Sequence, residues 1–228
     1  MLRSLLAGAA LLGAAFSAAS AELTPTETRW LQGAWPDIEH AREQGLPLDV
    51  IVQPQPEPGL PPLAMAFIGG RCKLVLSMRA NPAAETTLRD IPAEIRDAAL
   101  ELMAAHEIGH CRRHLDGAWH GVPAGFAPVT PDALSPELRK AYADMQATRR
   151  EEAFGDLVGL AWIQMKRPRV YAHLHAWLVA ERSKDLIPGS HHDTLAWLAL
   201  ARDGAVLRGT DVFEQPTALW RRGLGAQD

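Results

Sequence analysis

The chain has 228 residues, with 47% hydrophobic and 22% charged residues and a formal net charge of −4 at pH 7. This balance is typical of a globular protein that can fill a hydrophobic core, and the length suits one domain. There is no long basic run and only 6% of the residues are aromatic. We therefore expect no nucleic-acid partner.

The first 21 residues have the pattern of a secretory signal peptide. Arg3 supplies a short positive region, Leu5 to Phe16 is an apolar stretch, and Ala19-Ser20-Ala21 is a small-x-small cleavage site. The apolar stretch is shorter than the roughly 20 residues that a membrane span needs, although an uncleaved anchor is the alternative. The pattern predicts a periplasmic or secreted protein with no stable membrane span once the signal is removed.

In the first half of the mature chain we expect one helix followed by three strands. Thr24 is placed to cap a helix that starts at Pro25 and stops near Gly45, with a kink at Pro36. The proline-rich stretch 54–62 predicts an extended loop, and Gly69-Gly70 predicts a hairpin turn between the second and third strands. The expected strands are Leu48–Gln53, Leu63–Ile68 and Cys72–Met78.

The second half of the chain reads as mostly helical. The main helix is expected from Ile91-Pro92 to about Leu115, and after a Gly- and Pro-rich loop a second long helix should run from its cap Ser135 to Lys166. Two shorter helices are expected at about 169–184 and 192–203, whereas the residues after Gly209 cannot be assigned from the pattern. Residues 22–228 should therefore form a single α+β domain, with a small antiparallel sheet packed on a mostly helical body.

Two cysteines, Cys72 and Cys111, lie in the mature chain. An even number of cysteines in an oxidising compartment favours a disulfide, which would tie the main helix to the preceding strand. The alternative is a pair of buried free thiols.

The most informative motif is His106-Glu107-Ile108-Gly109-His110, within the main helix. The four-residue spacing places both imidazoles on one face, where they can share a metal ion. Glu107 projects beside them and could take a proton from a metal-activated water. The alternative interpretation is a helix with two surface histidines.

A catalytic zinc site usually has three protein ligands, so a third ligand must come from elsewhere in the chain. His114 continues the spacing, but it would lie about 12 Å from His106 along the helix axis. The longer motif with a third histidine after a glycine turn requires histidine where this chain has Asp116. Neither residue can complete the site in that way.

The second long helix offers Glu151 and Glu152. Asp156 lies one turn after Glu152, so one carboxylate could bind the metal while the other accepts a ring N–H from a histidine. Gly155 lies on the same stripe and would let this helix approach the one that carries the histidines. The alternative is a charged helix turn that faces solvent.

His106-Glu107-x-x-His110 followed by Glu152-x-x-x-Asp156 resembles the gluzincin metallopeptidases, in particular soluble relatives of the CAAX prenyl protease and heat-shock membrane protease family. The resemblance implies a zincin-like (minimal gluzincin) fold. It implies a Zn²⁺ ion bound by His106, His110 and Glu152, with Glu107 as general base and Asp156 supporting a ligand. It also implies that the strand Cys72–Met78 is an edge along which the substrate lies.

Related gluzincins place a histidine that stabilises the transition state after the glutamate ligand. His191 and His192 are the candidates, and we favour His192. A helix-capping turn with exposed histidines is the alternative, and Tyr142 and His120 are weaker candidates for the same role. The sequence therefore predicts an exported zinc endopeptidase that acts on proteins or peptides.

Two other classes of protein fit parts of the pattern. One is a secreted, non-catalytic binding or chaperone-like protein that retains a peptidase scaffold; the presence of Glu107 argues against it. The other is a structural zinc site with four protein ligands, of which His114 or a cysteine would be the fourth. Cys111 is a poor fourth ligand because it points about 100° away from His110 around the helix.

Overall fold

A computed structural model describes residues 22–117 and 135–225. The expected signal peptide at 1–21 and His120 lie outside these described residues. The helices and strands follow in the order α1 (Pro25–Glu43), β1 (Leu48–Pro54), β2 (Leu63–Ile68), β3 (Arg71–Arg79), α2 (Pro82–Asp90), α3 (Arg96–Leu115), α4 (Pro136–Lys166), η1 (Pro168–Val170), α5 (Tyr171–Ser183), α6 (Leu195–Leu200), η2 (Gly204–Leu207) and α7 (Glu214–Gly225).

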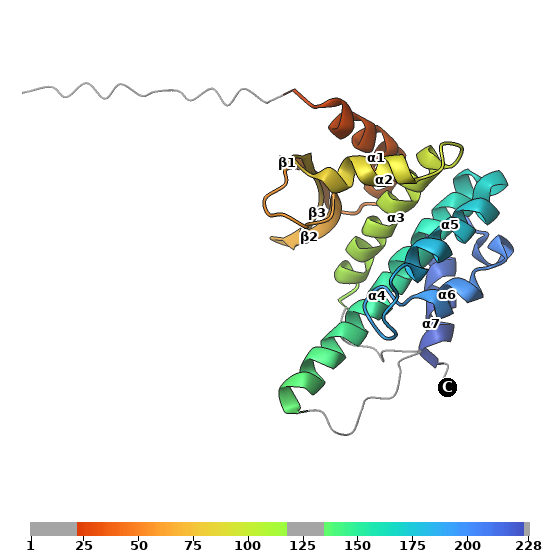
Figure 1. Cartoon of the computed structure of the whole chain (residues 1–228). Helices are drawn as coiled ribbons and strands as arrows, with labels where there is room; N and C mark the ends of the chain where they lie inside the picture. The colour runs from red at the N-terminus through yellow and green to blue at the C-terminus, as the bar shows by residue number, and fades with distance from the viewer. Residues whose placement is uncertain (1–21, 118–134, 226–228) are drawn as a thin grey trace, which may run out of the picture.

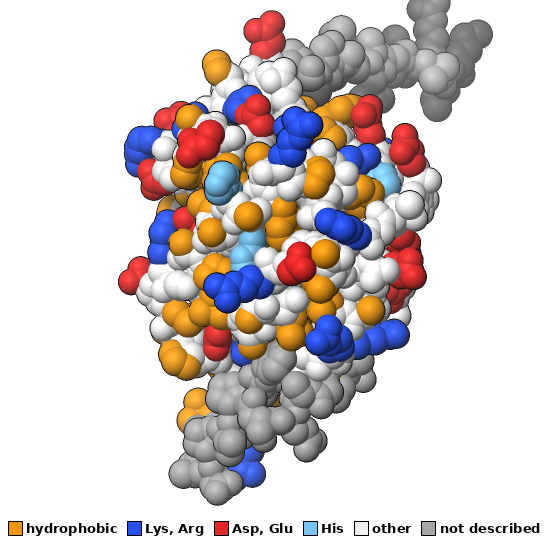
Figure 2. Space-filling view, turned by 90° about the vertical axis from the view of Figure 1, so that its right-hand side faces the viewer, with side chains coloured by type: hydrophobic (Ala, Val, Ile, Leu, Met, Phe, Trp, Pro, Cys, Tyr) orange, Lys and Arg blue, Asp and Glu red, His pale blue; other side chains and the backbone are white. Residues whose placement is uncertain are grey.

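The architecture is a three-stranded sheet packed beside a mostly helical body, which confirms the α+β class. Helix α3 lies between the sheet and α4, while α5, α6 and α7 surround α4 on the side away from the sheet (Figure 1). None of the helices in the described ranges meets the length and hydropathy that a bilayer span requires. On the face shown in Figure 2, apolar side chains are interspersed with acidic and basic ones rather than separated from them.

The two predicted helix caps, Thr24 and Ser135, are confirmed. The Thr24 hydroxyl accepts from the Glu27 N–H at 3.2 Å and the Glu27 carboxylate accepts from the Thr24 N–H at 2.7 Å, which is a complete capping box. Ser135 caps α4 by accepting from the Leu138 N–H at 3.4 Å. Helix α1 continues through Pro36 to Glu43.

The sheet is mixed, so the prediction of an antiparallel sheet was wrong. Its strand order is β1-β3-β2, with β3 antiparallel to β2 but parallel to β1. The long connection 55–62 places β2 two strand positions away from β1, and β3 then occupies the position between them. Gly69 and Gly70 close the predicted hairpin with φ of 60° and 74°, the left-handed values of a two-residue turn.

The central position of β3 corrects a second expectation. Cys72, Leu74 and Leu76 on this strand are 0% exposed, and both of its edges are paired. The strand Cys72–Met78 therefore cannot pair with a substrate. The edge of the sheet on the side of α3 is β2.

The main helix begins later than predicted. Pro92 disfavours the helical conformation at the preceding residue, and Ile91 is accordingly extended, with φ −76° and ψ 128°. The residues before it form the separate short helix α2, which Asn81 caps through the Ala83 N–H at 3.1 Å. Helix α3 therefore starts at Arg96.

The C-terminal helix α7, for which the sequence pattern predicted nothing, completes the core around α4. Trp220 is 1% exposed, its indole N–H donates to the Arg150 carbonyl at 2.8 Å, and its ring lies under the guanidinium of Arg113. Trp197 in α6 donates to the carbonyl of Trp220 at 3.1 Å. Buried tryptophans thus connect α6 and α7 to the helix that carries Glu152.

Small residues bring α3 and α4 close together, as the glycine stripe predicted. A side chain at Gly109 would lie 3.2 Å from the Cα of Gly155, and one at Gly159 would lie 2.7 Å from the carbonyl of Leu102. A side chain at Gly155 would lie 2.8 Å from the imidazole of His106. The two helices can therefore approach closely enough for their side chains to meet around one ion.

The predicted disulfide between Cys72 and Cys111 is present and joins β3 to α3. It closes a loop over a sequence separation of 39, and both cysteines are buried. We expect the double variant Cys72→Ala/Cys111→Ala to lose about 3–4 kcal/mol of unfolding free energy, because the unfolded chain gains conformational entropy. Urea denaturation measures this loss, and an unchanged midpoint and slope would contradict it.

Asp37 in α1 is a buried acid with no hydrogen-bond partner on another of the described residues. Burial, followed by the charge of Glu101, raises the pKa of Asp37 well above its usual value, although Lys166 and Arg167 oppose the shift. A carboxyl with a raised folded-state pKa stabilises the fold below its unfolded-state pKa. That contribution is lost as the pH rises through the folded-state value.

The variant Asp37→Asn cannot ionise, so it should gain unfolding free energy relative to the native protein as the pH rises. We expect the stability difference to be more favourable to the variant at pH 8 than at pH 4, by about 1 kcal/mol or more. Urea denaturation of both proteins at the two pH values measures this change. A difference that does not vary with pH would show that Asp37 ionises normally.

Candidate metal centre

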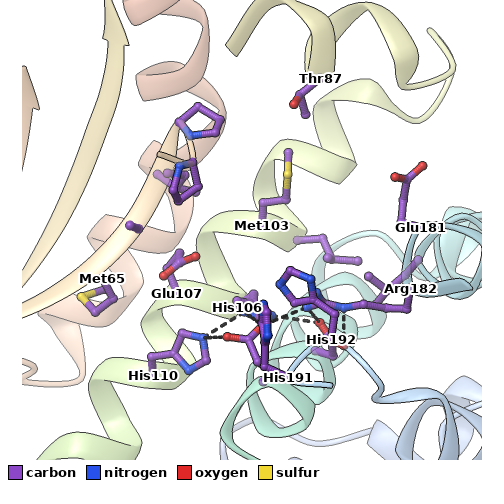
Figure 3. A pocket seen from close by; sticks show the side chains of 18 of the residues that line it. Met65, Thr87, Met103, His106, Glu107, His110, Glu181, Arg182, His191 and His192 are labelled. Carbon is purple, nitrogen blue, oxygen red and sulfur yellow. Dashed lines mark hydrogen bonds and ion pairs between the residues drawn. The ribbon is translucent and has the colours of Figure 1, made fainter. Parts of the chain in front are cut away.

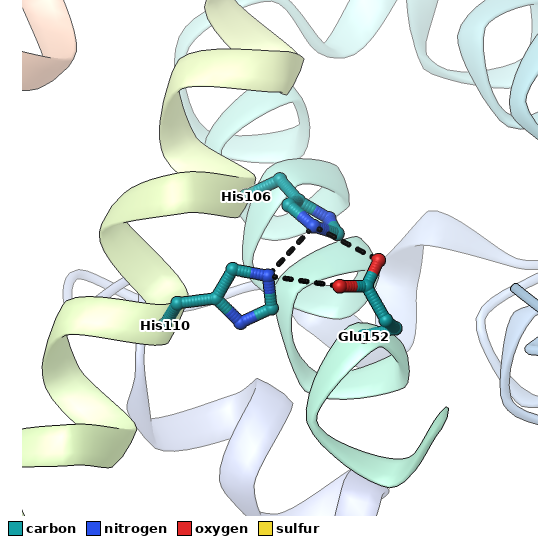
Figure 4. A group of neighbouring side chains, drawn as sticks. All are labelled: His106, His110 and Glu152. Atoms are coloured by element: carbon teal, nitrogen blue, oxygen red, sulfur yellow. Dashed lines mark hydrogen bonds and ion pairs between the residues drawn. The ribbon is translucent and has the colours of Figure 1, made fainter. Parts of the chain in front are cut away.

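The structure brings His106 and His110 of α3 together with Glu152 of α4 (Figure 4). The two Nε2 atoms lie 3.0 Å apart. Glu152 places one carboxylate oxygen 3.5 Å from the Nε2 of His106 and the other 3.4 Å from the Nε2 of His110. These three residues form a group that could hold a metal ion, and it is the only such group among residues 22–117 and 135–225.

The spacing of the donor atoms fits a small tetrahedral ion. Zinc bonds of about 2.1 Å give a tetrahedron with edges of about 3.4 Å. The Nε2 atoms lie 3.0 Å apart, each lies 3.4 or 3.5 Å from a different oxygen of Glu152, and one donor atom from each residue lies within 4.8 Å of the other two. Two imidazoles and one carboxylate are also a usual donor set for zinc in hydrolases, with one position left for water. The donor chemistry suits zinc, although other divalent transition metals accept the same ligands.

Asp156 contacts the imidazole of His106 at Nδ1, the ring nitrogen that does not face the cluster. Its Oδ1 lies 3.0 Å from the Nδ1 of His106, so a proton on Nδ1 leaves Nε2 free to bind the ion. This is the contact that a residue supporting a liganding histidine would make. The carboxylate also accepts from the Thr194 hydroxyl at 2.6 Å.

Arg182 of α5 connects the two carboxylates. Its Nε and Nη2 donate to Asp156 at 2.9 and 2.6 Å, and Nη2 lies 3.3 Å from a carboxylate oxygen of Glu152. The guanidinium therefore balances part of the negative charge of the buried Asp156 and the half-buried Glu152, which lie one helical turn apart. It also ties α5 to the centre.

These contacts govern the protonation of the group. Burial disfavours a charged imidazole, but Asp156 and Glu152 outweigh it and raise the pKa of His106 to about 10. Burial likewise opposes ionisation of Glu152, yet the two imidazoles hold its pKa well below the usual value. A metal ion would therefore have to displace a proton from the imidazole pair, and its affinity should increase with pH.

Among the described residues, β2 pairs with a strand on one side only, and its other edge faces α3. The Ser77 N–H donates to the Pro62 carbonyl at 2.8 Å, so Pro62 and Ser77 are a hydrogen-bonded pair. Hydrogen-bonded and non-hydrogen-bonded pairs then alternate along β2, as in any antiparallel ladder. Every second residue turns its main-chain groups away from β3 and toward the open edge. These residues are Leu63, Met65 and Phe67.

Glu107 lies between this edge and the imidazole pair. Burial raises the pKa of Glu107, while the charges of His110 and His106 and the backbone N–H of Met65 lower it; the net shift is upward. A carboxylate with a raised pKa is a stronger base, which suits proton abstraction near neutral pH. The edge strand thus holds the candidate base beside the candidate metal centre.

The centre opens into a cleft of about 800 Å³ bounded by β2, α3, α5 and the segment 184–192 (Figure 3). His191 and His192 both line this cleft. Partial burial, together with the charge of Arg182, lowers the pKa of His192, so its ring is neutral at pH 7. Tyr142 is not among the described residues that line the cleft.

Two residues considered from the sequence lie elsewhere. His114 stacks on the ring of Phe67 with centroids 3.9 Å apart, and Cys111 is bonded to Cys72. Neither can be a fourth metal ligand in this arrangement. Glu151 is 0% exposed at the side chain and pairs with Arg113 at 2.8 Å and Arg150 at 3.0 Å, and it is not part of the cluster.

The sequence interpretation missed Arg182 and Thr194, which both contact Asp156. The only available signal was indirect, because two buried acids one turn apart require a cation nearby. The chain has several arginines within and after α4, including Arg149, Arg150 and Arg167. Nothing in their spacing identifies Arg182 as the one that reaches the centre.

Removal of the charge at Asp156 tests whether this residue orients the imidazole of His106. We expect Asp156→Asn to lower the affinity for zinc about 10- to 100-fold, since the amide is a poorer acceptor for the N–H of His106 and loses the ion pair with Arg182. Competition with a chromogenic chelator measures the affinity. Unchanged affinity in a folded variant would show that Asp156 does not orient the ligand.

The chain matches no known protein-family model, and no curated protein or solved structure is significantly similar to it. The chemistry of the residues around the cleft is therefore the basis for any statement about function.

Proposed function

We propose that this protein is an exported zinc-dependent endopeptidase with a zincin-like domain, related to the gluzincins. The observation that carries the proposal is the convergence of His106, His110 and Glu152, with ligand atoms within 4.8 Å of one another, beside the half-buried Glu107. The disulfide supports export, because such bonds are typical of oxidising compartments.

The number of ligands favours a catalytic zinc site over a structural one. A structural zinc site has four protein ligands. Among the described residues only three suitable side chains converge, and they do so at the wall of a large cleft. A fourth position open to the cleft is the arrangement of a hydrolytic site.

The proposed mechanism assigns a distinct task to each residue. A bound zinc ion supplies Lewis acidity, which lowers the pKa of water to about 7 and polarises a substrate carbonyl. Glu107 accepts the proton of the attacking water and delivers it to the leaving amine. His192, neutral and within the cleft, is placed to donate a hydrogen bond to the oxygen on which negative charge develops.

The open edge of β2 suits a polypeptide substrate. The main-chain groups of Leu63 face outward two residues before Met65, whose N–H is directed to Glu107. An extended peptide could add to the sheet there as a further strand, with its backbone held by these groups. The peptide bond opposite Met65 would then lie next to the base and the ion.

Metal analysis of the purified protein, followed by digestion of an unbiased peptide library, tests the proposal. We expect about one zinc ion per chain, cleavage that stops with a chelator, and recovery when zinc is restored. Zinc without cleavage, but with peptide binding, would support a non-catalytic binding protein instead. Cleavage that ignores the chelator would exclude a metallopeptidase.

A further inference from the structure

Helix α3 presents two different faces to the rest of the molecule. His106 and His110 lie on the face that meets α4, where Glu152 completes the candidate metal centre. Glu107 and Cys111 are also four residues apart, so they share a second face that is turned by about 100° around the helix. Glu107 lies beside β2 in Figure 3, so this second face is directed at the sheet. The candidate base and the metal ligands therefore have different neighbours.

Three contacts join this second face of α3 to the sheet. They pair Glu107 with Met65, Cys111 with Cys72, and His114 with Phe67. From the first contact to the second, α3 advances by four residues, or about 6 Å. On the sheet, Cys72 lies opposite Phe67, which is two residues and about 6.7 Å beyond Met65. Because the two steps match, the hydrogen bond and the disulfide hold α3 in one register on the sheet.

The disulfide is the covalent member of these three contacts. Cys72 and Cys111 are both 0% exposed, and Cys72 belongs to the central strand, which is paired on both sides. The contact between Glu107 and Met65 is a hydrogen bond, which weakens steeply when its distance or angle changes. A small shift of α3 from the sheet would therefore separate the candidate base from the edge strand. The disulfide, one turn after Glu107, opposes such a shift.

Close helix packing holds the ligand face of α3 in a different way. A side chain at Gly109 would lie 3.2 Å from the Cα of Gly155, and one at Gly155 would lie 2.8 Å from the imidazole of His106. Asp156 fixes that imidazole through a contact of 3.0 Å. These contacts join α3 to α4 and do not involve the sulfur atoms. Loss of the disulfide should therefore displace the base more than the metal ligands.

We propose that Cys72 and Cys111 are positioning residues for the base: their disulfide holds Glu107 beside β2, so that hydrolysis, but not zinc binding, depends on their oxidation state. This rests on the proposed peptidase function and adds a means of regulating the same site. Formation of the bond removes two protons and two electrons from the two thiols. A low-molecular-weight disulfide accepts them by thiol–disulfide exchange and leaves as two thiols. The reduced protein binds zinc but hydrolyses peptides slowly.

The double variant Cys72→Ala/Cys111→Ala tests the kinetic part of the proposal. We expect kcat for a quenched fluorescent peptide to fall about 10- to 100-fold, as when a reacting group is displaced by about 1 Å. KM and zinc affinity should remain native. Leu174→Ala is the control for stability, because truncation of a buried leucine destabilises a fold about as much as loss of a disulfide. Leu174 is 0% exposed on α5 and does not line the cleft, so its kcat should remain native.

Hydrogen exchange gives a readout that does not require hydrolysis. The N–H of Met65 turns away from β3 and is directed to Glu107, whereas the N–H groups of Ala64 and Ala66 face β3. We expect the Met65 amide to exchange about tenfold faster or more in the zinc-loaded double variant than in Leu174→Ala. The amides of Ala64 and Ala66 should exchange equally in the two proteins.

Reduction and reoxidation of the native chain provide a rescue experiment. Protein that is unfolded, reduced with a phosphine and refolded with zinc should have the low kcat of the double variant. Oxidised glutathione should then restore the native kcat, while alkylation and mass spectrometry count the remaining thiols. Recovery on oxidation would show that the oxidation state, rather than a substituted side chain, sets the rate.

Each outcome decides one of the two proposals. Equal losses of kcat and zinc affinity in the double variant would overturn the positioning role, because the disulfide would then hold the ligands. Native kcat together with native exchange at Met65 would overturn it as well. Absence of hydrolysis by the oxidised native protein would overturn the peptidase instead. Faster exchange at Met65 with native zinc affinity would still support the positioning of Glu107 by the disulfide.

Discussion

Replacement of Glu107 by glutamine should lower kcat/KM for peptide hydrolysis by about 1,000-fold or more, while zinc remains bound. The amide has the shape of the carboxylate but cannot accept a proton from water at neutral pH. Its side chain is not one of the three converging donors, so the affinity for the ion should change little. Steady-state cleavage of a quenched fluorescent peptide, with zinc content measured in parallel, gives both quantities.

Glu85→Gln is the matched control for this variant. Glu85 is an exposed acid on α2 that does not line the cleft, so the same change of charge is made away from the centre. We expect its kcat/KM to equal that of the native protein. Turnover of Glu107→Gln at the native rate, with zinc present, would rule out Glu107 as the base.

The variant Glu152→Gln should weaken zinc binding by more than about 100-fold, which is a larger loss than the one expected for Asp156→Asn. It leaves two imidazoles and a neutral amide around the ion. The unfolding free energy of the metal-free protein should change less than the free energy of zinc binding, because the polar partners of Glu152 in the described part of the chain are the two imidazoles and Arg182. Isothermal titration with zinc and urea denaturation measure the two effects.

Glu151, the residue before Glu152, provides a control for which we expect a loss of stability but no loss of zinc affinity. Glu151 is fully buried and pairs with Arg113 and Arg150, so Glu151→Gln should cost about 3–5 kcal/mol of unfolding free energy. Zinc affinity should be retained where the variant folds, because Glu151 is not in the cluster. Equal zinc affinities for the Glu151 and Glu152 variants would contradict the assignment of Glu152.

Local signals in the sequence predicted the elements that carry the centre. Thr24 and Ser135 mark helix starts through their side-chain caps, and the spacing of His106 and His110 requires only helix geometry. The match of Glu152 to this pair followed from small residues on α4 that allow close packing. These predictions depend on neighbours within one or two helical turns.

Errors arose where a partner far along the chain decides the outcome. The position of β3 in the centre of the sheet depends on the path of the 55–62 connection, which the strand pattern does not encode. Helix α7 is held by Trp220 against α4, a contact over 70 residues that local propensity does not report. Arg182 likewise reaches Asp156 only because α5 packs along α4.

The most direct test of the account is a crystal structure of the zinc-soaked protein with anomalous diffraction measured on both sides of the zinc absorption edge. We predict one peak, about 2.0–2.2 Å from the Nε2 atoms of His106 and His110 and from a carboxylate oxygen of Glu152. A peak at another group of residues, or Glu152 turned away from the imidazole pair, would contradict it.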